Sequence, residues 1–390
     1  MARSDVKILY FDHEGGWGGA SRSLWYLIKN LDREIFTPEV WLRQKDPMAC
    51  RLQSANVSSK IVPNLPNMTP RAASHPANWI MNARRLAGMD KIAEEIIGTS
   101  ADILHFNYEG LAPLAWSLHR LGDVRPRILH VRTMNPVGLV TKAFVKYIAP
   151  LFDHIIFITE NEKAAFVGSG LDEGIATTVV YNCVSADLFD ENYEYPPSPP
   201  IVISFFGTLD HVRGVDRLIE LGALLKERAV PARINIFGRG PRYKKLLVFR
   251  RNNERDLTGL IENAGLADIV RLRGHSSTPE LEMISSHVVI RTSRGNDPWG
   301  RDIIEAASLG RSVIATGSFD KFVVPGQTGF LLGEWDARKA CDIIFKLSKE
   351  AGLAREMGAN ARVHAQKLFD PRSYARQITS IYNSVHSEGN

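Results

Sequence analysis

Short apolar runs recur along the chain, and most of them end at a glycine, a histidine or a polar cluster. Runs of about four to eight residues with such boundaries are typical of buried strands in a parallel sheet. We therefore expect strands at residues 6–11, 39–42, 101–107, 127–132, 201–206, 233–237, 287–292 and 313–316. A helical pattern spans 215–228, and a shorter one lies between the last two strands. Together these elements predict an α/β protein with parallel sheets.

A proline-rich segment at residues 191–200 interrupts this pattern. It can continue neither a helix nor a central strand, and 390 residues exceed what one hydrophobic core usually holds. We therefore predict one domain at residues 1–195 and a second at 196–370. A helical period begins at Pro371, so residues 371–390 are expected to contain a last helix.

Composition narrows the class of protein. The net charge is +5, but the basic excess lies in the second half, which weakens the case for membrane docking through the first. The basic run at 239–251 has no accompanying nucleic-acid motif, so no nucleic-acid partner is expected. The widely spaced Cys50, Cys183 and Cys341 argue against a disulfide framework and a zinc site. Without a long apolar span or a leader, we expect a cytoplasmic protein, at most in peripheral contact with the inner face of the membrane.

Two carboxylates, Asp297 and Glu305, flank a glycine turn and the predicted start of a helix. The turn follows the strand at 287–292, and open α/β sheets bind ligands at the carboxyl ends of their strands. Unpaired backbone N–H groups of Trp299, Gly300 and Arg301 would face sugar hydroxyls or phosphate oxygens there. The segment thus predicts a sugar-nucleotide site. On spacing alone, an acidic first turn with Glu305 on the surface fits about equally well.

Glycine-rich turns follow three other predicted strands. One spans 207–214 and contains Arg213, and another places Gly238 directly after the strand at 233–237. A third, with Gly18 and Gly19, opens a helix after the first strand, but its glycines do not fit the dinucleotide fingerprint G-x-G-x-x-G in any register. Such turns let a ligand approach the backbone closely, although a strand-to-helix turn also needs glycine for its own geometry.

The segment 297–316 resembles the E-x7-E region of retaining GT-B glycosyltransferases, especially family 4, whose pattern is approximately E-x-F-G-x-x-x-x-E-A-x-x-x-G-x-P-V-I-A. Gly300, Glu305, Ala306, Gly310 and residues 313–315 match it. Further segments at 207–214, 233–241 and 325–332 resemble the family's motifs in the family's order. The resemblance implies the GT-B fold, in which two Rossmann-like domains face an interdomain cleft, with the donor in the second domain and the acceptor in the first. It also implies that the last helix, at 371–390, crosses back to the first domain.

By the same resemblance, Asp297 contacts donor-sugar hydroxyls, Glu305 binds the nucleotide ribose, and Arg213 holds the donor diphosphate where lysine is common. Three positions depart from the pattern: Asp297 replaces a glutamate, Thr208 stands where arginine is usual, and Lys321 stands where glutamate is frequent. Candidates for a second phosphate-binding cation are Arg239, Arg242 and Arg294.

The first half resembles the same family in a G-G-x-x-x-x-L loop, with Gly18 and Gly19 at the pair. This implies that the loop meets the departing phosphate or the acceptor, with Trp17 either stacked on a sugar or buried in the core. The strand at 127–132 resembles one whose terminal histidine lies near donor sugar and acceptor, which makes His130 the acceptor-side candidate. Packing is the alternative role for His130 and is favoured for His105. Segments 155–159 and 178–184 resemble the later strands of this domain.

As a whole, the resemblance predicts a retaining, metal-independent glycosyltransferase that serves glycan, polysaccharide or glycolipid synthesis. It would move a hexose-type sugar from a UDP- or GDP-sugar to a hydroxyl of a saccharide or lipid-linked acceptor, with no cofactor beyond the donor substrate. Catalytic roles fall to His130, Arg213 and Asp297. Donor binding falls to Gly18, Gly19, Thr208, Arg213, Gly238, Trp299, Gly300, Arg301 and Glu305. Two alternatives stay open: a catalytically idle sugar-nucleotide-binding or scaffolding subunit, which the departures favour, and a sugar-nucleotide epimerase or hydrolase on the same fold.

Overall fold

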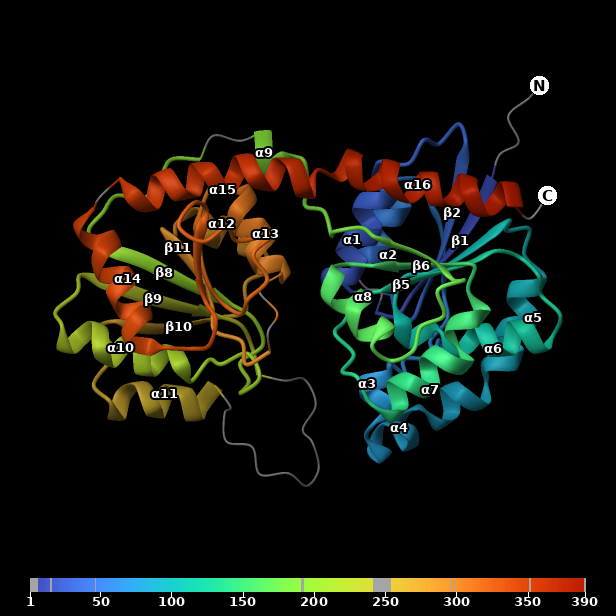
Figure 1. Ribbon diagram of the computed structural model, residues 1–390, viewed down its shortest axis with the longest axis horizontal. Helices are drawn as coiled ribbons and strands as arrows, with labels where there is room; N and C mark the ends of the chain where they lie inside the picture. The colour runs from blue at the N-terminus through green and yellow to red at the C-terminus, as the bar shows by residue number, and fades with distance from the viewer. Residues whose placement is uncertain are drawn as a thin grey trace. The chain divides into compact units, whose positions relative to one another are not determined.

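A computed structural model describes residues 6–14, 16–45, 47–190, 193–240, 254–295, 297, 299–350 and 352–388 (Figure 1). The chain forms two compact units, one made of residues 1–183 with 371–390 and the other of residues 184–370. The division falls between Cys183 and Val184, so the proline-rich segment belongs to the second unit. The last helix belongs to the first unit.

The described part of the first unit contains a seven-stranded parallel sheet in the order β3-β2-β1-β4-β5-β6-β7. Its strands are β1 (Val6–Asp12), β2 (Phe36–Leu42), β3 (Ser58–Ile61), β4 (Ile103–Phe106), β5 (Arg127–Val131), β6 (His154–Phe157) and β7 (Ala176–Val179). Its α-helices are α1 (Gly19–Lys29), α2 (Pro47–Ser54), α3 (Pro70–Ala73), α4 (Pro76–Ala87), α5 (Met89–Ile97), α6 (Pro113–Arg120), α7 (Leu139–Tyr147), α8 (Glu160–Val167) and α16 (Pro371–Glu388). Short 3-10 turns lie at Glu109–Leu111 and Ala149–Leu151.

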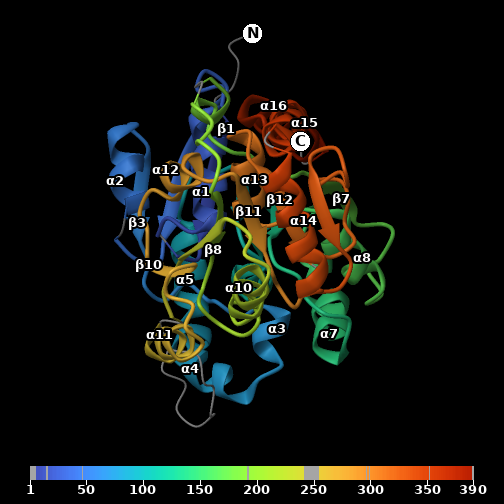
Figure 2. The same ribbon diagram turned by 90° about the vertical axis from the view of Figure 1, so that its left-hand side faces the viewer.

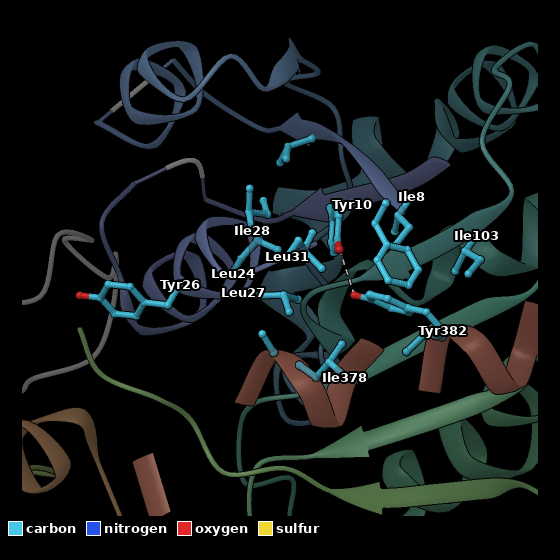
Figure 3. Close-up of a cluster of buried hydrophobic side chains, with 14 of the residues drawn as sticks. Ile8, Tyr10, Leu24, Tyr26, Leu27, Ile28, Leu31, Ile103, Ile378 and Tyr382 are labelled. Carbon is cyan, nitrogen blue, oxygen red and sulfur yellow. Dashed lines mark hydrogen bonds between the residues drawn. The ribbon is translucent and has the colours of Figure 1, made fainter. Parts of the chain in front are cut away.

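Side chains that alternate along β1 supply two separate cores. Ile8 and Tyr10 join the core that α1 and α16 cover, whereas Leu9 and Phe11 join the core that α5 and α6 cover. In the first core, the Tyr382 hydroxyl of α16 donates a hydrogen bond of 3.1 Å to Tyr10 (Figure 3). Because both faces of the sheet are buried, its inner strands are apolar almost throughout, which is the pattern that predicts a parallel sheet.

The described part of the second unit contains a six-stranded parallel sheet in the order β10-β9-β8-β11-β12-β13. Its strands are β8 (Ile201–Phe206), β9 (Ala232–Phe237), β10 (Val270–Gly274), β11 (Val288–Arg291), β12 (Ser312–Thr316) and β13 (Gly329–Leu332). Its helices are α9 (Asp187–Asp190), α10 (Arg217–Glu227), α11 (Glu254–Asn263), α12 (Pro279–Ile284), α13 (Arg301–Ser308), α14 (Ala337–Lys349) and α15 (Leu353–Phe369).

Helices also cover this second sheet. Helices α10 and α14 pack together over its core, and Figure 2 shows them in front of the strands. Helices α13 and α15 pack on each other and against β12. Their contact is close, because a Cβ on Gly358 of α15 would come within 2.1 Å of the carbonyl oxygen of Gly310, just after α13.

The predicted parallel α/β architecture is confirmed, and the predicted strands are present with their ends shifted by a few residues. The predicted helix at 215–228 is α10, which begins at Arg217. Strand β3 was not predicted, because all four of its residues are exposed at the edge of the sheet and form no apolar run. Strand β7 ends at Val179, so most of the predicted strand at 178–184 is loop.

Candidate functional site

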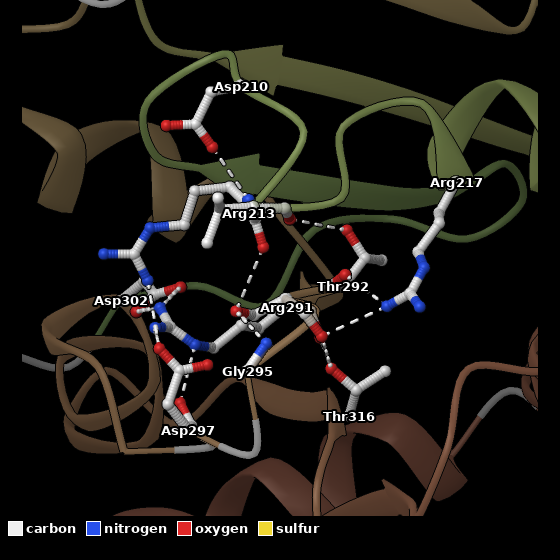
Figure 4. Close-up of polar contacts among 11 residues, drawn as sticks. Asp210, Arg213, Arg217, Arg291, Thr292, Gly295, Asp297, Asp302 and Thr316 are labelled. Atoms are coloured by element: carbon white, nitrogen blue, oxygen red, sulfur yellow. Dashed lines mark hydrogen bonds and ion pairs between the residues drawn. The ribbon is translucent and has the colours of Figure 1, made fainter. Parts of the chain in front are cut away.

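Two loops meet at the carboxyl edge of the second sheet. The strand order reverses between β8 and β11, and open α/β sheets bind ligands at such a switch point. The loop after β8 spans 207–216, and the loop after β11 spans 292–300. The Thr292 hydroxyl donates to the carbonyl oxygen of Gly214 at 2.8 Å, and the Arg294 amide donates to that of Val212 at 2.8 Å. Figure 4 shows Thr292 of the second loop next to Arg213 of the first. The two motifs predicted to bind the donor therefore lie side by side.

Two glycines leave room for close packing in and between these loops. Gly214 has a φ of +70°, and a Cβ there would come within 1.9 Å of the Thr292 carbonyl oxygen. A Cβ on Gly300 would come within 2.3 Å of both Arg291 Nη1 and Asp302 Oδ1. Neither position can hold a larger residue without displacing its neighbours.

A buried arginine organises the acidic residues of the site. Arg291, the last residue of β11, donates to both carboxylate oxygens of Asp302, at 2.8 and 3.0 Å. It also donates to Asp297, at 2.7 Å to the carboxylate and 2.9 Å to the backbone carbonyl. Burial alone would lower the pKa of Arg291, but the carboxylates of Asp302 and Asp297 outweigh it and raise the pKa. Asp297 is thereby held in one orientation.

Arg213 and Asp297 form the accessible part of this network. Their side chains are 38% and 27% exposed, and Arg213 Nη1 lies 3.3 Å from Asp297 Oδ2. Burial and the nearby Arg291 lower the pKa of Arg213, although the guanidinium stays charged at neutral pH. Asp297 Oδ1 is buried and makes no hydrogen bond. A cation and an unused carboxylate oxygen thus lie next to each other.

The predicted residues around the start of α13 also gather here. Gly300 is the N-cap, and Trp299 is 7% exposed and packs edge-to-face on Phe319 with ring centroids 5.4 Å apart. Glu305 is 2% exposed and accepts a hydrogen bond of 2.8 Å from Arg301 Nε. The alternative that placed Glu305 on the surface is wrong.

The other donor-side predictions lie on neighbouring turns. Thr208 is exposed in the loop after β8. Gly238 follows β9, where a Cβ would come within 1.9 Å of the Gly207 carbonyl oxygen, so this turn packs directly on the first loop. Lys321 is exposed.

The candidates for a second phosphate-binding cation differ in their surroundings. Arg294 is held by Asp216 through two hydrogen bonds of 2.8 and 2.7 Å. Arg239 is exposed, and its carbonyl oxygen accepts a hydrogen bond of 3.0 Å from the amide of Leu209. Arg242 and Pro241 lie outside the described residues.

The first sheet has its own switch point, between β1 and β4. Three polar residues end or follow adjacent strands there: Asn107 Nδ2 donates to Asp12 Oδ1 at 3.0 Å, and Arg132 Nη2 donates to Asn107 Oδ1 at 2.6 Å. Gly18 is the N-cap of α1 and Gly19 its exposed first residue, so both predicted glycines border this edge. Trp17 is partly buried beneath Arg51, whose Cζ lies 3.9 Å from the indole centroid.

His130 is fully buried within the first unit. Its Nδ1 accepts a hydrogen bond of 3.1 Å from Arg132 Nη2, because a guanidinium can only donate. Burial, assisted by Arg132 and by His105, lowers the pKa of His130 far below its usual value. The ring is therefore neutral, and its burial fits the packing alternative, so a catalytic role for His130 stays a prediction.

Sequence reasoning did not identify Arg291, Asp302 or the cluster of Asp12, Asn107 and Arg132. A signal for Arg291 exists, since it is a charged residue that closes a run of apolar positions and is followed by two aspartates. The cluster gave a weaker signal, because each of its members follows a different strand.

In the described part of the chain, no group of three or more histidine, cysteine, aspartate or glutamate residues is placed to hold a metal ion. Among the same residues, no helix is both long enough and apolar enough to span a membrane.

Two family models together match most of the chain. The model described as Glycosyltransferase Family 4 matches residues 17–188, and the model described as Glycosyl transferases group 1 matches residues 190–364. The boundary between the matches lies close to the division between the two compact units.

Individual proteins show the same similarity. A D-inositol 3-phosphate glycosyltransferase from Gordonia bronchialis is 27% identical over 193 residues, which cover 48% of this chain but only 41% of that protein. The capsular polysaccharide biosynthesis glycosyltransferase CapM from Staphylococcus aureus is 24% identical over 288 residues, 68% of this chain and 73% of that protein. The crystal structure of Anabaena HepE in complex with UDP has a TM-score of 0.73 at 20% identity, covering 97% of this chain and 100% of that one, so the fold is GT-B.

Proposed function

Because this chain belongs to the glycosyltransferases described as family 4 and group 1, we propose that it transfers a hexose-type sugar from a UDP-sugar to a hydroxyl of a saccharide or lipid-linked acceptor. The observation that carries this proposal is the pairing of Arg213 with Asp297, at 3.3 Å, on the switch point of the second sheet. UDP is the favoured nucleotide of the donor because HepE, which has the same fold, forms complexes with UDP and with UDP-glucose. A saccharide acceptor is favoured by the similarity to CapM.

In the proposed complex, each group at the switch point has one task. The Arg213 guanidinium donates to the diphosphate and stabilises the charge that develops as it leaves. The Asp297 carboxylate, whose side chain is partly exposed, accepts from a hydroxyl of the donor sugar, and Glu305 accepts from the ribose. Arg213 can exchange Asp297 for phosphate at little cost, since a half-exposed ion pair is worth only about 0–1 kcal/mol and Asp297 keeps Arg291.

The reaction needs no protein nucleophile. The bond between the anomeric carbon and the diphosphate oxygen breaks, and the acceptor oxygen bonds to that carbon on the same face. The acceptor proton passes to the departing phosphate oxygen. Because the new bond forms on the face that the diphosphate leaves, the anomeric configuration is retained. We assign the donor to the second unit, residues 184–370, and the acceptor to the first unit, residues 1–183 with 371–390.

Product analysis tests this proposal. The full chain is incubated with UDP-glucose, UDP-galactose or UDP-N-acetylglucosamine and with saccharide or lipid-linked acceptors, and UDP release and the anomeric proton signals of the product are followed by NMR. We expect UDP release that depends on the acceptor, with an α-linked product. A β-linked product would contradict retention. Release without an acceptor would indicate a hydrolase, and UDP binding without turnover would indicate the idle subunit.

A further inference from the structure

A cavity of about 390 Å³ lies in the second unit, away from the candidate donor site. Its lining includes Leu309 and Gly310, which follow α13, and Arg311, which directly precedes β12. It therefore borders the amino-terminal edge of the sheet, whereas Arg213 and Asp297 lie at the carboxyl edge. Helix α13 separates the two places by its length of about 12 Å.

The floor of this cavity is an arginine with an unusual environment. Arg311 is 1% exposed, and its Nη2 donates to the Glu194 carbonyl oxygen at 3.3 Å. Its Cζ lies 5.0 Å from the ring centroid of Tyr195, and its Nε is buried without a hydrogen bond. Among the described residues, no carboxylate forms an ion pair with Arg311. Buried charges in proteins are normally paired, because an unpaired one is expensive to desolvate.

Two more arginines line the same cavity. Arg362 is half-buried and donates to the Phe189 carbonyl oxygen, and Arg355 is exposed at the opening. The carboxylate of the lining, Glu194, is exposed. Three guanidinium groups and a single carboxylate thus line one small cavity, so the positive charges outnumber the negative one. This arrangement has the chemistry of a site for an anion.

We propose that this cavity binds a small soluble ligand that carries a phosphate group. Guanidinium groups match phosphate oxygens through paired, charge-assisted hydrogen bonds, and Arg311, whose buried Nε makes no hydrogen bond, is one of the lining residues. The rings of Tyr193 and Tyr195 line the cavity and supply an apolar surface for a sugar or base attached to the phosphate. The volume lies within the range of roughly 300–1,000 Å³ that is usual for small-molecule sites. This site is separate from donor binding.

Calorimetric titration of the full chain with glucose 6-phosphate tests the proposal. We expect saturable one-to-one binding, and a Kd at least about tenfold higher for Arg355→Ala, since the variant loses a charge-assisted contact. Arg355 is exposed, so this variant should fold, and Arg311→Lys, which keeps the charge but removes Nε, should also weaken binding. Arg338→Ala is the matched control, because Arg338 is an exposed arginine of α14 outside the cavity. Arg213→Ala should leave this Kd within about twofold.

Several results would overturn the proposal. Wild-type protein that does not bind glucose 6-phosphate would do so, as would an equal loss of affinity in Arg338→Ala or in Arg213→Ala. Inorganic phosphate should compete and glucose should not, and the reverse would exclude recognition through phosphate. Binding to vesicles of phosphatidylcholine and phosphatidic acid that Arg355→Ala abolishes would assign the site to a lipid headgroup instead of a soluble ligand.

Discussion

Arg291 sets the orientation of the acidic residues in the candidate donor site. It holds Asp302 through two hydrogen bonds and Asp297 through two more, and it accounts for the absence of a side chain at Gly300. Without Arg291, the buried carboxylate of Asp302 would lose its ion-pair partner, a change that typically costs about 3–5 kcal/mol, and Asp297 would keep only Arg213. Arg291 is therefore a positioning residue, which leaves Asp297 fixed beside Arg213.

In the first unit, a buried histidine makes stability depend on pH. Burial, with a smaller effect of Arg132, lowers the pKa of His105 from 6.5 to about 3. In the unfolded chain His105 binds a proton below about pH 6.5, whereas in the folded protein its lowered pKa keeps it neutral at that pH. Acid therefore favours the unfolded state, and stability is lost as the pH falls below about 6.5. Between pH 7 and pH 5, His105→Gln should therefore lose about 2 kcal/mol less stability than the wild type. Urea unfolding at both pH values, followed by circular dichroism, measures the difference.

The pH dependence of the wild type has to be compared with that of His105→Gln, because other buried groups of the first unit also make its stability depend on pH. Burial lowers the pKa of His130, which adds to the loss in acid, and burial raises the pKa of Glu109, which opposes it. These groups are present in both proteins. If His105→Gln and the wild type lost the same stability between pH 7 and pH 5, His105 would not be held neutral by the fold.

At the scale of elements, the start of α13 depends on a glycine. Gly300 has ordinary backbone angles, with φ −67° and ψ 165°, so alanine is excluded there by its neighbours and not by its own backbone. Gly300→Ala would push Arg291 or Asp302 aside, since the new Cβ would lie 2.3 Å from each. We expect it to lower the free energy of unfolding by about 1–3 kcal/mol and to weaken UDP binding.

A matched glycine supplies the control for this prediction. A Cβ on Gly333 meets no atom within 4 Å, so Gly333→Ala should change stability by less than about 0.5 kcal/mol and leave UDP binding unaltered. Thermal unfolding and UDP titration of both variants are the measurements. Equal behaviour of the two alanine variants would show that the packing around Gly300 is not what positions α13.

Elements were more predictable from the sequence than contacts were. Apolar runs predicted most strands because the inner strands of each sheet are buried on both faces. Strand β3 was not predicted, because its position at the edge of the sheet leaves it exposed. Glycine turns and the spacing of Asp297 and Glu305 predicted which loops meet at the second sheet. The pairing of Arg291 with Asp302 was not predictable, since it depends on how α13 packs against β11. The burial of Glu305 and His130 likewise follows from packing that spacing does not report.

At the scale of the whole molecule, the chain has two units with separate cores. The last helix completes the core of the first, where Ile378 and Tyr382 are fully buried, and none of its described residues belongs to the core of the second. Arg213, Asp297, Trp299 and Glu305 all belong to the second unit. Substitutions among them should therefore change donor binding and leave the core of the first unit intact.

Calorimetric titration with UDP, compared with GDP, ADP, TDP and CDP, is the most direct test of the central claim that the switch point of the second sheet binds the donor nucleotide. We predict that the wild type prefers UDP and that Arg213→Ala weakens UDP binding about ten- to hundredfold, as expected for the loss of charge-assisted hydrogen bonds to the diphosphate. Arg338→Ala should bind UDP like the wild type. Equal UDP affinity in Arg213→Ala and the wild type, or no binding of any nucleotide by the wild type, would contradict the account.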